Sequence, residues 1–405
     1  MSVTSSSPDA PAALPAKGLS LGQDAWRRLR KNHVAMTCLF TLITIAVLAF
    51  LTPLLPLAPP DQHHTSLQYE PPKLQPLFDR TFSLNWKAID EASGQLAEVR
   101  EKLVAAKSQQ PTDDSKSEVK RLQNEMQSIL YRPYRDAGFP DVGLITRWMI
   151  RTRSQVFGDW ALGSLAGRDQ FGRDVLSRVF WGARISIIVG LVATFVSLVI
   201  GVTYGAIAGY VGGWLDEVMM RFVDILYSIP FIFVVIFLIT ILGEDHTKAW
   251  LESWGIDRIT IFYFVVGAIY WLTMARVVRG QVISLRTEPF IEAAQSIGAR
   301  QSRIIWRHIL PNLLSVVIVY LTLTIPRVML FEAFLSFLGL GVEPPDVSWG
   351  LLANEGIKVI TPIKIYWWLI VFPSLALGIT LYALNFLGDG LRDALDPKMA
   401  GRGSK

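Results

Sequence analysis

The sequence predicts an all-α, polytopic membrane protein with about six transmembrane helices. Hydrophobic residues make up 51% of the 405 residues, and most of them stand in runs without Asp, Glu, Lys or Arg. A helix needs roughly 17–25 such residues to cross a bilayer. The runs cover residues 34–55, 185–215, 225–243, 259–275, 308–326 and 365–388. Several runs in one chain make buried helices of a water-soluble core a poor explanation, and we expect the fifth helix to continue towards Leu340.

Basic residues predict the orientation, because cytoplasmic loops of membrane proteins carry an excess of Lys and Arg. A basic turn at residues 26–31 precedes the first run, and we expect it in the cytoplasm, beside anionic membrane lipid. Six crossings then put the arginine-rich loop 286–311 and both termini in the cytoplasm. The same bias accounts for the formal net charge of +5, so no nucleic-acid partner is expected.

Five regions follow from these runs. A cytoplasmic tail with a basic amphipathic turn (1–33) leads into the first span (34–55). An extracytoplasmic insertion (56–183) separates that span from the membrane core (184–390). A cytoplasmic tail (391–405) ends the chain.

Within the insertion, apolar residues recur at heptad-like spacing in two stretches. They are Ile89, Leu96, Val99 and Leu103 in the first stretch, and Val119, Leu122, Met126 and Ile129 in the second. A polar break at residues 109–113 separates the stretches. Two helices joined by a short turn form an antiparallel hairpin with one narrow apolar seam. The hairpin is either a solvated spacer or a contact surface for another protein.

Residues 289–311 form a polar, arginine-rich segment between two apolar runs. Helix-forming residues up to Ile297, a break at Gly298 and a second amphipathic piece ending near Pro311 predict a helical knuckle. Such a knuckle suits docking of another protein, because it transmits force into both neighbouring spans; the alternative is an ordinary exposed helix. The candidate docking residues are Glu292, Ala293, Ala294, Gly298, Arg303, His308 and Pro311.

Charged residues inside spans are candidates for function, because burying them in lipid is expensive. Arg221 and Asp224 lie three residues apart at the start of the third span, where an interfacial ion pair is the favoured interpretation. Arg327 and Glu332 lie within the fifth span after Pro326, and there a pore or gate lining competes with structural pairing. All four are retained as pore or gate candidates.

A further group of charges, with a glycine, precedes the second span and predicts a structured entry into it. Its candidate residues are Asp169, Gly172, Arg173 and Asp174. A second stretch with several glycines, residues 332–350, ends in Trp349 and Gly350. These glycines allow tight turns and close backbone approach at the outer mouth.

Four of these stretches resemble one family. Residues 289–311 resemble the EAA loop of ABC import permeases. The ending at residues 307–312 resembles the peptide/nickel branch of that superfamily. Residues 167–178 are similar to the family segment G-T-D-x-x-G-R-D-x-x-S-R, with Arg168 where threonine is usual. Residues 332–350 resemble E-x-x-L-S-F-L-G-L-G-x-x-P-P-x-x-S-W-G, and residues 388–397 resemble G-D-x-L-R-D-x-L-D-P. The insertion at 71–160 is longer than expected for this family and carries no known motif.

The resemblance implies the C-type permease subunit of the oligopeptide/dipeptide/nickel family of ABC importers, with the type I permease fold. It implies a bacterial inner-membrane protein that imports peptides by alternating access. The implied partners are a second homologous permease, two cytoplasmic ABC ATPases that use ATP-Mg, and an extracytoplasmic solute-binding protein. The chain itself is expected to bind no cofactor or metal.

Other functions remain open at this point. The same machinery could import nickel, an oligosaccharide or a peptide antibiotic, because specificity resides largely in the binding protein. A secondary transporter or channel would carry an inverted repeat and acidic clusters within the membrane, and neither is evident. An enzyme is not expected, since the sequence contains no G-x-x-x-x-G-K-[ST], G-x-S-x-G or HExxH motif and only one cysteine.

Overall fold

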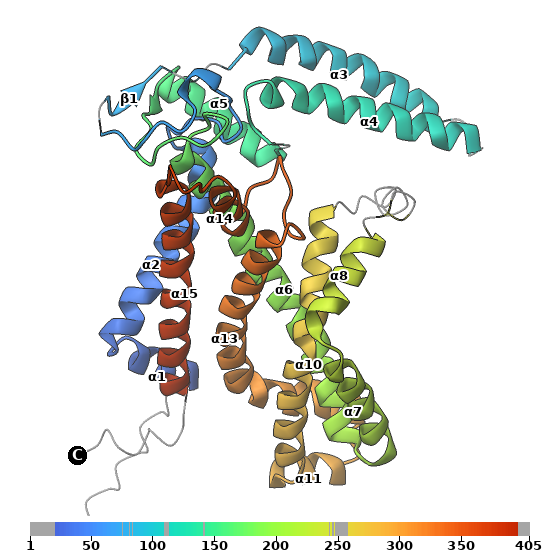
Figure 1. Cartoon of the computed structure of the whole chain (residues 1–405). Coiled ribbons are helices and arrows are strands. Elements are labelled where there is room, and N and C mark those ends of the chain that lie inside the picture. Colours follow the sequence, from blue (N-terminus) through green and yellow to red (C-terminus); the bar gives the residue numbers. More distant parts are fainter. Residues whose placement is uncertain are drawn as a thin grey trace, which may run out of the picture.

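The computed structural model describes residues 21–395 with short gaps, and most of this part is helical (Figure 1). The gaps are Gln75, Thr81, Ser83, residues 109–112, Asp141, Gly243, residues 245–246 and residues 248–257. Residues 1–20 and 396–405, which make up most of the two predicted tails, lie outside the described part, as does most of the predicted break at 109–113.

Five helices are long and apolar enough to cross a bilayer, and a bent pair adds a sixth crossing if it forms one span. The five are α2 (His33–Leu51), α6 (Val175–Val211), α10 (Arg258–Arg286), α13 (Leu310–Phe337) and α15 (Trp368–Leu395). The bent pair is α7 (Gly213–Ser228) and α8 (Phe231–Leu242), which meet at 89°. The predicted fold class, an all-α polytopic membrane protein with about six spans, is confirmed.

The predicted third span at 225–243 is not one straight helix. Its first residues belong to α7, and α8 begins only at Phe231. Proline lacks an amide hydrogen and pushes the preceding residue into an extended conformation. Ile229, before Pro230, is indeed extended, with φ −81° and ψ 126°. The proline therefore divides the apolar run between two helices.

The most extensive helix pair in the bundle is α6 with α10. Gly201, Gly205 and Gly209 stand four residues apart on the side of α6 that faces α10. A Cβ atom at Gly205 would lie 2.4 Å from the carbonyl oxygen of Ala275. Small residues at this spacing let two helix backbones approach closely within a membrane. The two helices therefore form the most closely packed part of the bundle.

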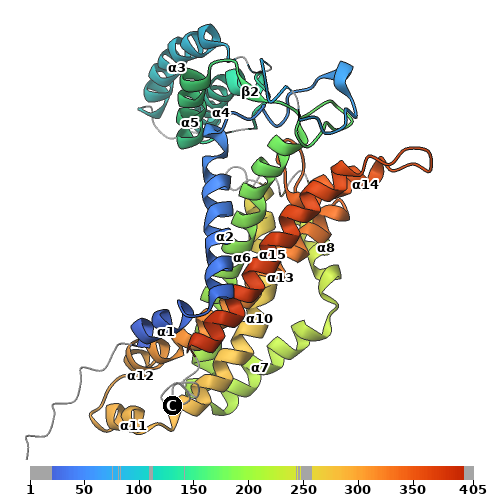
Figure 2. The same ribbon diagram turned by 90° about the vertical axis from the view of Figure 1, so that its left-hand side faces the viewer.

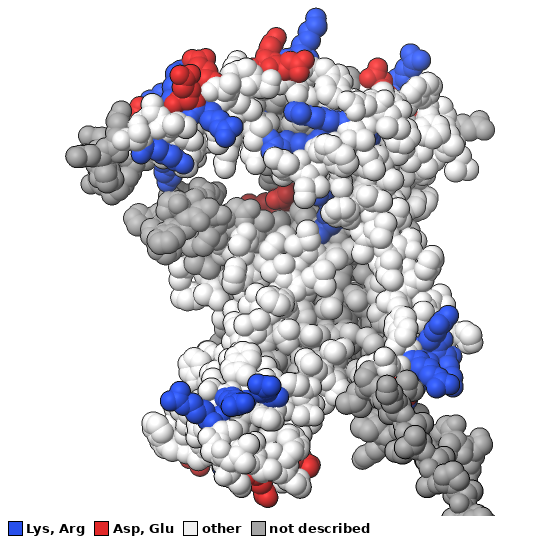
Figure 3. All heavy atoms as spheres, turned by 180° about the vertical axis from the view of Figure 1, so that it is seen from behind, with Lys and Arg blue, Asp and Glu red and all other residues white. Residues whose placement is uncertain are grey.

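Charged side chains on the face in Figure 3 gather towards two ends and leave the middle almost uncharged, as a bilayer requires. One end, here called the knuckle end, carries α1 (Leu21–Leu29), the last turns of α15 and the knuckle, residues 289–311 (Figure 2). The other, the insertion end, carries the long insertion. Leu29 packs with Ala394, so the first and last described elements lie together at the knuckle end.

The insertion contains two long helices where the heptad pattern predicts them. These are α3 (Trp86–Lys107) and α4 (Asp113–Arg135), which lie side by side (Figure 1). Val99, Leu103 and Leu122 are buried in the seam between them. Ile89 lies instead in a second apolar cluster with Phe82 and Tyr134, which joins the base of the hairpin to the rest of the insertion.

Short elements complete the insertion. They are η1 (Thr52–Leu54), η2 (Thr65–Leu67), α5 (Leu144–Phe157) and a two-stranded antiparallel sheet of β1 (Phe78–Asp79) and β2 (Ala161–Leu162). Arg153 of α5 lies buried among them and donates hydrogen bonds to the carbonyl oxygens of Leu57 at 3.3 Å and Trp160 at 2.8 Å. Burial lowers the pKa of Arg153 to about 10. One side chain thus ties α5 to the segment that follows it and to a segment 96 residues earlier in the chain.

Candidate functional site

The knuckle joins α10 to α13 through two short helices and a turn. They are α11 (Pro289–Ser296), α12 (Gln301–Ile304) and the π-helical turn η3 (Ile305–Ile309). Gly298 lies between α11 and α12 with φ +77°, a left-handed conformation that favours glycine. Its amide donates to the carbonyl oxygen of Gln295 at 2.9 Å, and the amide of Ala299 donates to that of Ala294 at 3.1 Å. These bonds close the end of α11.

The second half of the knuckle does not end at Pro311, contrary to the prediction. The helix continues from η3 into α13 over residues 301–337 without a break. Pro311 lies just after the π-helical turn η3, and a local π-helical adjustment of this kind lets a membrane helix accommodate a proline. The knuckle therefore passes directly into a membrane span, so that a displacement of the knuckle moves the span as well.

The inner face of the knuckle is apolar and fully packed. Its buried side chains are Ile291, Ala294, Ile304 and Ile309, each at most 5% exposed. They pack against Tyr210 of α6 and against Val278 and Val282 of α10. The knuckle is thus wedged onto the ends of the two most closely packed helices of the bundle.

The outer face of the knuckle presents most of the predicted docking residues. Glu292, Ala293, Gly298, Arg303 and Pro311 are exposed, whereas His308 is half-buried and Ala294 belongs to the inner face.

Three large apolar residues of the knuckle are also exposed: Phe290 at 40%, Ile297 at 86% and Trp306 at 63%. They are not among the docking residues predicted from the sequence, although large apolar side chains in a polar loop are a usable signal. Exposed apolar groups rimmed by polar ones mark protein interaction surfaces. The face therefore has the composition of a docking surface.

Ion pairs tie α7 to α10 near the knuckle. Arg279 binds Asp216 through two hydrogen bonds of 2.7 Å, and Arg276 binds Asp224 at 2.7 Å. The expected pair between Arg221 and Asp224 is wrong, because the carboxylate of Asp224 turns to the neighbouring helix. Arg221 stands exposed on α7 and does not line the cavity described next.

A cavity of about 440 Å³ lies between the bend of α7 and α8, α10 and α13. Its polar lining consists of Tyr227, Ser228, Tyr270, Thr273, Tyr320, Thr324 and Arg327. Arg327 is exposed, and its carbonyl oxygen accepts a hydrogen bond from the hydroxyl of Tyr270 at 3.2 Å. The volume is within the range of small-ligand sites. Of the four pore or gate candidates, Arg327 is the one that lines this cavity.

Glu332 lies elsewhere, in a cluster of serines at the insertion end of α13. It is completely buried and accepts hydrogen bonds from Ser336 at 2.8 Å and from Ser186 at 3.4 Å. Ser348 also contacts it. The expectation that Glu332 faces a wet lumen or a partner subunit does not hold in this conformation, because three hydroxyl groups satisfy the carboxyl group within the chain.

Trp349 and Gly350 join this serine cluster and not the charged entry segment. They begin α14 (Trp349–Lys358). The amide of Trp349 donates to Ser186 Oγ at 3.1 Å, and its indole donates to the carbonyl oxygen of Val179 at 2.9 Å. A Cβ atom at Gly350 would lie 2.4 Å from Ala333 Cα. These contacts fix α14 against α6 and α13.

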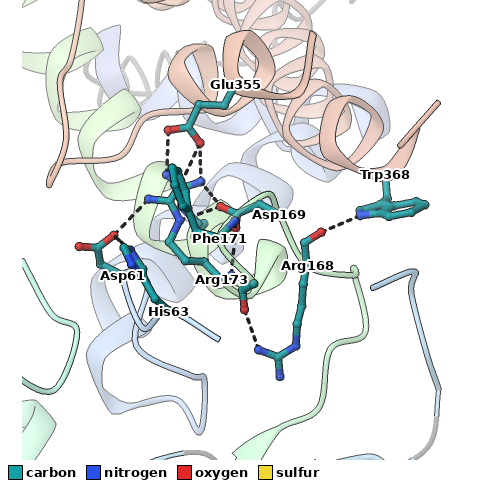
Figure 4. A network of polar contacts seen from close by, with 10 residues as sticks. Asp61, His63, Arg168, Asp169, Phe171, Arg173, Glu355 and Trp368 are labelled. Carbon is teal, nitrogen blue, oxygen red and sulfur yellow. Dashed lines mark hydrogen bonds and ion pairs between the residues drawn. The ribbon is translucent and has the colours of Figure 1, made fainter. Parts of the chain in front are cut away.

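The entry segment before α6 is the centre of a buried ionic network (Figure 4). Asp169 accepts from Arg173 Nε at 2.7 Å and from Arg178 at 2.9 Å. Both arginines also bind Glu355 of α14, and Arg173 reaches Asp61 at 3.1 Å. Asp169, Arg173 and Arg178 are each at most 4% exposed. Glu355 and Asp61 carried no sequence signal, because they are far from the motif in the chain.

Three further residues complete this segment. Arg168 stands at the position where the resembled family usually has threonine. It donates a hydrogen bond to the carbonyl oxygen of Gly172 at 2.9 Å. Gly172 has φ +74°, and a Cβ atom there would lie 1.9 Å from the carbonyl oxygen of His64. Asp174 caps α6 by accepting from the amide of Ser177 at 2.7 Å. Burial raises the pKa of Asp174 to about 6, although this hydrogen bond opposes the rise.

Comparison with known proteins gives matches over both ends of the chain. The family model described as binding-protein-dependent transport system inner membrane component matches residues 201–401. The model described as N-terminal TM domain of oligopeptide transport permease C matches residues 20–72. Neither match includes residues 73–200, which contain the helical hairpin and the charged entry segment.

Individual relatives agree with these matches. The chain is 46% identical over 249 residues to the oligopeptide transport system permease protein OppC of Haemophilus influenzae, covering 59% of this chain and 75% of that protein. It is 47% identical over 249 residues to OppC of Escherichia coli K12 (59% and 77%). It is 43% identical over 233 residues to the dipeptide transport system permease protein DppC of Bacillus subtilis (58% and 68%).

These relatives are matched over at least two thirds of their own length. The family models and the relatives point to the same family. The chain therefore belongs to the family of ABC transporter inner membrane permease subunits that includes the OppC and DppC proteins.

Proposed function

We propose that this chain is the C-type permease subunit of an ATP-driven importer that moves peptides of the oligopeptide or dipeptide class into the cytoplasm. The names of its relatives support the peptide substrate. The observation that carries the proposal is the knuckle, which combines an exposed apolar edge with an inner face wedged onto α6 and α10. That combination suits a surface that another protein grips and moves.

The proposed assembly has four further polypeptides. A second homologous permease completes the translocation path, two cytoplasmic ABC ATPases dock on the knuckles, and an extracytoplasmic solute-binding protein delivers the peptide. ATP-Mg is used by the ATPases, and this chain binds no cofactor. Both termini and the knuckle face the cytoplasm of a bacterial inner membrane. The arginines of loop 286–311 and the common position of the knuckle, α1 and the end of α15 support this orientation.

Transport in this proposal is alternating access with the energy supplied from outside the chain. Closure of the ATPases displaces the knuckle, and the displacement passes into α13 because no break separates them. The ion pairs of Asp216 and Asp224 carry α7 along with α10. The cavity around Arg327 then changes its accessibility from one side of the membrane to the other.

Reconstitution into proteoliposomes tests the proposal. The complete complex should take up radiolabelled peptide only with ATP, and the chain without ATPases should take up none. Uptake by the chain alone would contradict the proposal in favour of a secondary transporter or channel. A co-purified binding protein loaded with nickel or an oligosaccharide would leave the machinery in place but replace the substrate.

A charge reversal on the knuckle tests the docking role. Glu292 is exposed, so Glu292→Lys should abolish uptake and recovery of the ATPases with the permease while leaving membrane insertion intact. Glu101→Lys, which reverses another exposed charge, in the hairpin, serves as the control and should retain the ATPases. Normal uptake by Glu292→Lys would count against docking at this face.

A further inference from the structure

The cavity between the bend after α7, α10 and α13 contains an arginine whose charge no acidic residue of the described part of the chain neutralises. Two other arginines of this region, Arg276 and Arg279, each bind a carboxylate at 2.7 Å. Among the residues that the structure describes, Arg327 has no acidic partner, although it lies well inside α13. An ionised side chain at such depth is costly and is retained where it faces a wet path or a ligand.

The remaining polar groups of the cavity are hydroxyls. They come from α7, α10 and α13 and belong to Tyr227, Ser228, Tyr270, Thr273, Tyr320 and Thr324. A hydroxyl group can donate a hydrogen bond to a backbone carbonyl or accept one from a backbone amide. It can therefore bind the backbone of a peptide whatever side chains that peptide carries. The described lining contains no Asp or Glu. Its charge therefore suits an anionic ligand and not a cationic one.

We infer that Arg327 binds the terminal carboxylate of the peptide during its passage, and that the surrounding hydroxyls bind the peptide backbone. This inference rests on the proposed function. All linear peptides share a backbone and a carboxyl terminus, whereas their side chains differ. A planar guanidinium matches a carboxylate in two parallel hydrogen bonds. Recognition of these shared groups gives a path that tolerates many sequences and still holds each peptide in one direction.

The experiment compares a peptide with a free carboxyl terminus and the same peptide with a C-terminal amide. Both are offered, with the same binding protein, to complete complexes in proteoliposomes that carry wild-type chain, Arg327→Gln or Arg327→Lys. Each variant is compared with wild type on the same substrate, so any preference of the binding protein cancels. Lys358→Gln removes an exposed charge outside the cavity and is the matched control.

For Arg327→Gln we expect uptake of the free acid to fall about tenfold and uptake of the amide to change less than about twofold, as for loss of one charge-assisted hydrogen-bonded pair. Arg327→Lys keeps the charge without the planar fork and should fall between the two. Lys358→Gln should leave both rates unchanged. The retained amide uptake shows that the variant complex is folded and coupled.

Two results would overturn the inference while leaving the proposed function intact. In the first, Arg327→Gln lowers uptake of acid and amide by the same factor, which assigns Arg327 a structural role. In the second, neither substrate is affected. Failure of the wild-type complex to transport either peptide would instead refute the proposed function and remove the basis of the inference.

Discussion

The two ends of the molecule hold charge in opposite ways. At the insertion end, Asp169, Arg173 and Arg178 are buried and satisfied by one another and by Glu355. At the knuckle end, Glu292 and Arg303 are exposed beside large apolar side chains. Breaking a buried pair leaves a charge without compensation, whereas exposed charges contribute little to stability. We interpret the first end as a fixed frame and the second as a surface for a moving partner.

The largest expected effect comes from altering the knuckle. Gly298 has φ +77°, and proline fixes φ near −65°, so Gly298→Pro cannot form the turn that separates α11 from α12. We expect ATP-driven uptake to fall to background, with normal amounts of the chain in the membrane. Peptide uptake and immunoblotting of membranes measure the two quantities.

Gly298→Asn is the matched control, because asparagine tolerates the left-handed conformation. It should retain most of the uptake. Equal loss in both variants would mean that the absent side chain, and not the turn, is what the partner requires.

A smaller effect on transport but a large one on stability is expected at the insertion end. Arg178 is 2% exposed and binds two carboxylates. Arg178→Met should lower the free energy of unfolding by about 3 kcal/mol, the lower bound for breaking a buried pair, because Arg173 still contacts both acids. The thermal unfolding midpoint of the detergent-solubilised chain checks this.

The exposed pair between Lys102 and Glu98 gives the comparison its control. Lys102→Met should leave the unfolding midpoint unchanged, since exposed ion pairs contribute little. Equal shifts in the two variants would remove the distinction between a buried frame and a solvated surface.

Much of this comparison follows from the sequence. Charge-free runs predict the spans, and heptad spacing predicts α3 and α4, because both patterns are local. The ionic network is not local: Arg173 and Asp61 are 112 residues apart, and Arg178 and Glu355 are 177 apart. The acids of a network of this kind look like ordinary surface residues until the fold brings them together.

Errors in the prediction have both local and non-local causes. Pro230 breaks a run that composition alone marks as one span, whereas the helix that was expected to end near Pro311 continues through it into α13. Arg327 and Glu332 have the same sequence signature, a charge within an apolar run. Only the structure distinguishes them: Arg327 lines a cavity, whereas Glu332 is buried in a serine cluster. Sequence position gives depth along a helix but not the neighbours on its other side.

The smallest expected effect on transport concerns Asp174, whose titration affects the stability of the fold. Its pKa is raised from 3.8 to about 6 by burial, against the opposing effect of the Ser177 amide. Between these values the folded chain holds a proton that the unfolded chain releases. The contribution of this group to stability is therefore greatest below the unfolded pKa and is lost as pH rises to about 6.

Asp174→Asn keeps a side chain that caps α6 and removes this pH dependence. The unfolding midpoint of the variant minus that of wild type should be near zero at pH 4 and positive at pH 7. A difference that does not change with pH would contradict the raised pKa.

The central claim is that this chain is moved by other polypeptides that grip its knuckle from the cytoplasm. Ile297 is 86% exposed at the tip of that knuckle, so a membrane-impermeant maleimide can report on Ile297→Cys, with Cys38→Ser removing the native thiol. We predict labelling in inverted membrane vesicles stripped of the ATPases, protection when the ATPases are restored, and no labelling in intact spheroplasts. Labelling from outside the cell, or labelling that the ATPases do not change, would contradict the account.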